Sequence, residues 1–148
     1  MTYNALFDHV SWTIDRAPES ARLDHTDPED PANQAMLNSI AFDGAKSIIL
    51  VANRWDHGMG PVIHFPAGTT ILQVLTAIAN DYQVRPMTED EIHMETEGGG
   101  FNLTWDKARR DYDEGRHVHR IDIMGWAVFF EGFYATDDPN VLRLSLGG

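Results

Sequence analysis

The sequence predicts an α+β domain: a mostly antiparallel sheet with two or three helices packed on one face, ending in a C-terminal β-meander. Strand-like apolar runs come first, helical patterns occupy the middle, and strand-like runs return at the end. One strongly amphipathic helix follows a short strand near the centre of the chain. The length of 148 residues and a hydrophobic fraction of 43% fit one globular domain over residues 1–148.

The central segment, residues 61–85, is the clearest local signal. A short apolar run ends at Pro66, and Thr69 or Thr70 can cap the helix that follows, because a threonine hydroxyl accepts a hydrogen bond from a first-turn amide. Pro86 ends this helix. Its apolar stripe has helical spacing and consists of Ile71, Val74, Leu75, Ile78 and Tyr82. We expect this helix to cover the sheet.

The segments before it predict two strands and a short helix. Residues 10–14 are predicted as a first strand. Asp30 caps a helix that has Pro31 at its first position, with Met36, Leu37 and Ile40 on its buried side. Residues 46–52 contain a continuous apolar run, which is typical of a strand covered on both faces.

The segments after it predict two helices and three strands. Thr88 and Glu91 have capping-box spacing for a second helix, and residues 103–114 form a third that ends at Gly115. Strands over 119–124, 127–134 and 141–146 make the meander, and Gly132 fits a bulge in it. Leucines alternate with Arg143 and Ser145 in the last strand, so one of its faces should meet water.

Composition excludes several function classes. With 23 acidic against 11 basic residues, the formal charge of −12 disfavours nucleic acid and anionic membranes as partners. The absence of cysteine excludes disulfides and thiol catalysis and favours a reducing compartment. The N-terminus lacks the pattern of a secretory signal, and no apolar run is long enough to span a membrane, so we expect a cytoplasmic protein. Composition leaves the oligomeric state open.

Several segments resemble, in order and spacing, a domain family of unknown function expanded in mushroom-forming basidiomycete fungi. They include Trp12 to Asp15, Pro18 to Leu23, the central helix with the Pro86 that follows it, and Arg120 to Gly125. The resemblance implies a fungal, intracellular, single-domain protein and supplies no catalytic residue. Arg120 and Asp122 stand two apart in the predicted strand, so we expect them to share a face.

His117 and His119 are the candidate metal ligands. Residues i and i+2 of a strand project from one face, so both imidazoles could bind one divalent metal ion. The alternative is that both are partly solvated residues at a strand edge. We expect no cofactor other than such a metal.

Three further residues are candidates for acid–base catalysis. Asp56 precedes His57 in a glycine-flanked loop, and a neighbouring carboxylate can orient an imidazole and raise its pKa. His64 alternates with Ile63 and Phe65, which places it on the open face of the sheet if helices cover only the other. The alternative is that each of these three residues has only a structural role.

Aromatic residues near the C-terminus are the candidate ligand-binding group. Phe129 and Phe130 face opposite sides of one strand, so one side of this cluster is either covered or an apolar interface. The binding candidates are Trp55, Trp126, Phe130 and Tyr134. The favoured function is therefore a non-enzymatic module that binds a protein or a small apolar ligand, and the alternative is a small acid–base or metal-assisted enzyme.

Overall fold

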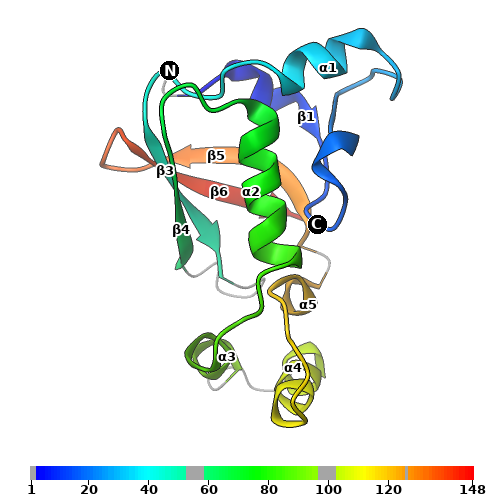
Figure 1. Cartoon of the computed structure of the whole chain (residues 1–148), viewed down its shortest axis with the longest axis vertical. Coiled ribbons are helices and arrows are strands. Elements are labelled where there is room, and N and C mark those ends of the chain that lie inside the picture. Colours follow the sequence, from blue (N-terminus) through cyan, green and yellow to red (C-terminus); the bar gives the residue numbers. More distant parts are fainter. Residues whose placement is uncertain (1–2, 53–58, 97–102, 126) are drawn as a thin grey trace.

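The computed structural model describes residues 3–52, 59–96, 103–125 and 127–148 (Figure 1). The elements, with η for a 3-10 helix, are η1 (Ala5–His9), β1 (Val10–Ser11), η2 (Pro18–Ser20), β2 (Arg22–Leu23), α1 (Pro31–Leu37), β3 (Lys46–Val51), β4 (Met59–Phe65), α2 (Ile71–Gln83), α3 (Glu89–Thr96), α4 (Leu103–Asp113), α5 (Ile121–Met124), β5 (Phe129–Ala135) and β6 (Val141–Gly147). The α+β class is confirmed.

The main sheet has four strands in the order β4-β3-β6-β5. β3 pairs antiparallel with β4, and β5 pairs antiparallel with β6. The two hairpins join through a parallel pairing of β3 with β6, which brings residues 47–49 beside residues 141–143. β1 and β2 form a separate two-stranded ribbon. The sheet is therefore mostly antiparallel, as predicted.

Helix α2 lies across one face of this sheet (Figure 1). Its first turn is closed by a capping box, in which Thr70 Oγ1 accepts from the Gln73 amide and Gln73 Oε1 accepts from the Thr70 amide, at 3.2 and 2.9 Å. The predicted apolar stripe is completely buried against the sheet. At the far end of the stripe, the Tyr82 hydroxyl donates to the carbonyl of Val51 and accepts from its amide. The helix is thereby bonded to β3.

The N-terminal segment completes the cover of the same face beside α2. Phe7 in η1 packs edge-on against Phe133 of β5, with ring centroids 4.9 Å apart, and Trp12 packs against Phe130. Phe130 and Phe133 both point into the core although they are three residues apart, because the register of β5 shifts between them. Gly132 lies in that shift with φ +90°, which confirms the predicted bulge.

Helices α3 and α4 lie with α5 beyond one end of the sheet (Figure 1). Buried residues of these helices and of the connections before α3 and α5 form a second small core, which consists of Met87, Ile92, Ala108, Val118 and Ile123. The capping box at Thr88 and the end of α4 before Gly115, which has φ +83°, are as predicted. The predicted placement of two or three helices on one face is corrected: of α2, α3 and α4, α2 alone lies across the sheet (Figure 1).

Three local predictions were wrong. Residues 119–124 contain the short helix α5 instead of a strand, so two strands, β5 and β6, close the chain. The first strand covers only Val10 and Ser11. Ile40 was expected to be buried but is 52% exposed, because α1 ends at Leu37 and Ile40 lies in the connection after it.

Candidate functional site

The candidate site is the face of the main sheet opposite α2. Strand alternation directs one set of side chains to α2 and the other set away from it. Ile48 and Leu50 of β3 point to the core and are buried, whereas Ile49 between them is only half-buried. The outward-facing side chains that are exposed or half-buried are Ser47, Ile49, Val62, His64, Phe129, Glu131, Tyr134, Val141 and Arg143. We call this set the open face.

A single row of side chains crosses the open face from edge to edge. Ile49 lies opposite Val62 in one direction and opposite Arg143 in the other, and Arg143 lies opposite Tyr134. At the usual strand spacing this row extends over about 14 Å. Val62 is 48% exposed and Tyr134 is 62% exposed. Two aliphatic groups, a cation and an aromatic ring thus stand side by side; we call them the cross-strand row.

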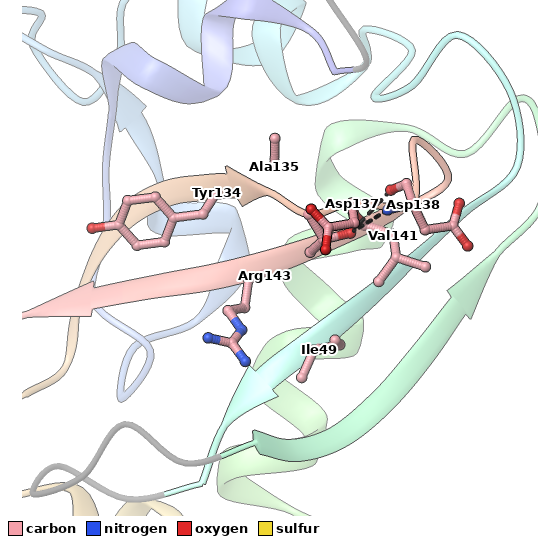
Figure 2. Close-up of a pocket in the computed structure, with 8 residues that line it drawn as sticks. Ile49, Tyr134, Ala135, Asp137, Asp138, Val141 and Arg143 are labelled. Atoms are coloured by element: carbon pink, nitrogen blue, oxygen red, sulfur yellow. Dashed lines mark hydrogen bonds between the residues drawn. The ribbon is translucent and has the colours of Figure 1, made fainter.

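A hollow of about 480 Å³ lies over part of this row (Figure 2). Ile49, Val141 and Arg143 come from β3 and β6, and Tyr134 comes from β5. Figure 2 shows Asp137 and Asp138 at one end, on the turn between β5 and β6. Among the described residues, the guanidinium of Arg143 has no hydrogen bond or ion pair, and its side chain is exposed. The hollow therefore offers an apolar floor, one cation and an acidic end.

The turn from 136 to 140 is rigid because its own side chains satisfy its backbone. Thr136 Oγ1 donates to the carbonyl oxygens of Val141 and Asp138, at 2.8 and 3.0 Å, and accepts from the Asp138 amide. The Asp138 carboxylate accepts from the Asn140 amide at 2.9 Å, an Asx turn. The turn chemistry was evident in the sequence, and its result is that the Asp138 carboxylate is held at the rim beside Asp137.

A second hollow, of about 370 Å³, adjoins the open face at the start of β3. Ser47 Oγ and His64 Nδ1, from paired positions on β3 and β4, are 2.6 Å apart. Lys46, which also lines this hollow, is only 7% exposed. Its ammonium lies 2.9 Å from Asp43 and holds the pKa of that carboxyl below its usual range. A hydroxyl, an imidazole and an ammonium therefore surround this hollow.

An ion-pair network attaches the α3–α4–α5 cluster to the sheet. Arg120 is 2% exposed; its Nη1 donates to the Ala52 carbonyl at 2.6 Å, and its Nη2 donates to the Glu91 carboxylate. Arg85 binds the same carboxylate through two hydrogen bonds, of 2.8 and 2.9 Å. The hydrogen bonds from Arg85 are the main cause that lowers the pKa of Glu91 to about 2, and the charge of Arg120 adds to it. The network positions elements and lies away from the open face.

This role of Arg120 was not predicted from the sequence. Arg120 and Asp122 were expected on one face of a strand, whereas Arg120 points inward and Asp122 is exposed. The Asp122 carboxylate accepts from the His119 amide at 2.9 Å and so closes the turn that begins α5.

The predicted metal ligands precede α5. His117 is exposed and His119 is half-buried, and they lie in the connection before the helix instead of on a strand. His119 forms an isolated bridge with Pro86, and its Nδ1 lies 3.8 Å from an Asp122 oxygen. Among the described residues, no three histidine or carboxylate side chains group closely enough to hold a metal ion. Metal binding by His117 and His119 stays a prediction.

The other predicted site residues divide into three groups. His64 and Tyr134 lie on the open face, where the sequence had placed His64. Phe130 is 6% exposed and belongs to the core, so it is not available to a ligand in this structure. The remaining four lie outside the described residues: Trp55, Asp56, His57 and Trp126.

Comparison with protein families identifies the chain. The model of a family of unknown function, DUF6699, matches residues 10–140. The chain belongs to this family. Neither curated proteins nor solved structures gave a significant match to this DUF6699 chain. Within the described part of the DUF6699 chain, every helix is too short or too polar to cross a lipid bilayer.

Proposed function

We propose that this DUF6699 domain is a non-enzymatic binding module whose open face holds a partner protein. The observation that carries the proposal is the cross-strand row, in which Val62 and Tyr134 expose large apolar surfaces on either side of Arg143. Exposed apolar side chains grouped on one face are characteristic of interaction sites. Tyrosine and arginine are also enriched among the residues that dominate interface energies.

The shape of the face favours a protein over a small molecule. Sites for small ligands are concave and enclose most of the ligand surface. The cross-strand row extends over all four strands, and Tyr134 remains 62% exposed beside the hollow. A protein surface can cover an area of this extent, with one side chain inserted between Ile49 and Arg143.

Charge favours a partner that is basic overall. The chain carries a formal charge of −12, which increases the rate of encounter with cationic proteins. Asp137 and Asp138 place two carboxylates at one end of the hollow. The turn that carries them, residues 136–140, is fixed by its own hydrogen bonds. A lysine or arginine of the partner would bind there, next to an apolar or aromatic group that packs on Tyr134.

Site-specific photo-crosslinking tests this proposal. The full chain carries benzoylphenylalanine at position 134 in one sample and at the exposed position 114 of the α4 end in the other. We expect one protein to be crosslinked from position 134 alone, and the yield to fall when Arg143→Ala is added. Equal crosslinking from both positions, or no effect of Arg143→Ala, would count against the open face.

A second candidate function rests on the Ser47–His64 pair. An imidazole 2.6 Å from a hydroxyl can act as its general base, and Ser47, His64 and Lys46 line one hollow. This arrangement supports the alternative of a small acid–base enzyme. A fluorophosphonate probe tests it: labelling of Ser47 that His64→Gln abolishes would favour an enzyme, and an unlabelled serine would leave the binding module as the better account.

Native mass spectrometry with and without a chelator distinguishes the remaining alternatives. An excess mass removed by the chelator would support a metal-assisted enzyme with His117 and His119 as ligands. An excess mass indifferent to the chelator would indicate a small apolar ligand. We further propose a cytoplasmic location and a fungal origin, supported by the absence of cysteine and by the resemblance described above.

A further inference from the structure

We propose that the outer edge of β4 accepts an extended segment of a partner protein as an added fifth strand of the sheet. This surface adjoins the open face proposed above and shares Val62 with it. β4 is the terminal strand of the order β4-β3-β6-β5. Among the described residues, no strand or isolated bridge pairs with its other side. Every second residue of an edge strand directs its N–H and C=O groups outward, and another strand is their natural partner.

A groove runs beside this edge. It has a volume of about 460 Å³ and lies between Ile63 of β4 and the C-terminal part of α2. Ile63 points to the α2 side of the sheet, since it lies opposite the buried Ile48. Ala77 and Val84 provide the apolar wall on the helix side. A strand paired with β4 would insert every second side chain into this groove.

Two exposed apolar residues flank the edge on opposite sides. Val84 is 64% exposed beside the groove, and Val62 is 48% exposed on the open face. The side chains of an added strand alternate between these two sides, so a single extended segment would cover both. Val62 and Val84 belong to the small group of large hydrophobic residues that the described structure leaves exposed. One occupant thus accounts for both exposures.

The charges favour a basic segment over a second copy of this chain. Two copies paired through β4 would bring together chains that each carry a formal charge of −12. In the groove, Arg85 is already bound to Asp81 and Glu91, so it contributes little free positive charge. Asn80 is exposed at the rim and can accept a hydrogen bond from a lysine or arginine. Pro61 has no amide hydrogen, which limits the pairing to about residues 62–65.

The experiment uses a displayed library of random ten-residue peptides selected on the full chain. We expect selected peptides that alternate β-branched or aromatic residues and carry lysine or arginine. Bound peptide should slow amide hydrogen exchange in residues 62–65. Val84→Lys should weaken binding about tenfold, because it places an ammonium group in the apolar groove, where it also repels a basic segment. Ile40→Lys is the matched control, an equally drastic change at another exposed aliphatic residue, and should leave binding unchanged.

The proposal would be overturned if no peptide were selected, if the bound peptide protected amides outside β4, or if the peptide bound Val84→Lys and the wild type equally. A dimer whose protection at residues 62–65 rises with protein concentration would assign the edge to a second copy and would also overturn it. Tyr134→Ala separates this proposal from the open face. It should leave peptide binding at β4 unchanged while it weakens binding to a partner on the cross-strand row.

Discussion

Arg120 donates a hydrogen bond of 2.6 Å from Nη1 to the carbonyl oxygen of Ala52, although 68 positions separate the two residues in the sequence. The donor precedes α5 and the acceptor directly follows β3. Because the same guanidinium also binds Glu91, one side chain connects the end of the sheet with α3. The α3–α4–α5 cluster therefore depends on a side chain that is 2% exposed.

Arg120→Met should destabilise the protein by about 3 kcal/mol, because it leaves a buried carbonyl and a partly buried carboxylate without their donor. Arg116→Met is the control: Arg116 is exposed and pairs on the surface, so its loss should cost about 0.5 kcal/mol or less. Urea unfolding of both variants measures the difference. Equal losses would show that the Arg120 contacts contribute no more than a surface pair.

The contribution of the Glu91 ion pairs to the free energy of unfolding should also depend on pH. The pKa of Glu91 is about 2 in the folded state and 4.5 in the unfolded chain. Between pH 2 and pH 4.5 the folded state therefore binds fewer protons than the unfolded state. The stabilisation is complete above pH 4.5 and is lost as the pH falls from 4.5 to 2. We expect a loss on the order of 1–2 kcal/mol after solvent screening.

Urea unfolding of wild type and Glu91→Gln at neutral pH and at about pH 3 measures this contribution. Glu91→Gln should be less stable at neutral pH and should show a smaller further loss in acid. Glu89→Gln, an exposed change on the same helix, serves as control. A Glu91→Gln variant that follows the wild type at every pH would contradict the assignment.

How much of this could be predicted from the sequence depends on how local the signal is. The Thr70 cap and the apolar stripe of α2 lie within the helix and its first turn; the stripe was predicted correctly, and Thr70 was one of the two caps that the sequence allowed. The parallel register that places Ile49 opposite Arg143 joins distant segments, and no local pattern shows it. The apolar run containing Ile49 was visible but was interpreted as a strand covered on both faces. Because Ile49 is only half-buried, the outward-facing part of this apolar run belongs to an open surface and not to a covered one.

The Tyr82 hydroxyl is a similar contact between distant segments. It is buried, donates to the Val51 carbonyl at 2.8 Å and accepts from the Val51 amide at 2.9 Å. Tyr82→Phe should cost about 2 kcal/mol, because both main-chain groups are left without a partner in the core. Thermal unfolding checks this loss. An unchanged melting temperature would mean that these groups find other partners.

Gly132 should tolerate no side chain at the β5 bulge. Its φ of +90° is unfavourable for other residues, and an added Cβ would lie 3.4 Å from the Asp8 carboxylate. Gly132→Ala should destabilise by about 1–2 kcal/mol. Gly44→Ala is the control, since nothing lies within 4 Å of an added Cβ there. If the two substitutions were equally mild, the bulge would accommodate a side chain at position 132, which would contradict the prediction.

The central claim is that the cross-strand row binds a protein partner. Calorimetric titration of the crosslinked protein, once purified, against the wild type, Tyr134→Ala and Glu114→Ala tests it most directly. Glu114 is exposed after α4, away from the row. We predict that Tyr134→Ala weakens binding about tenfold or more while Glu114→Ala changes it less than about twofold. Equal affinities for all three proteins would contradict the claim and would direct the search for function to the Ser47–His64 hollow.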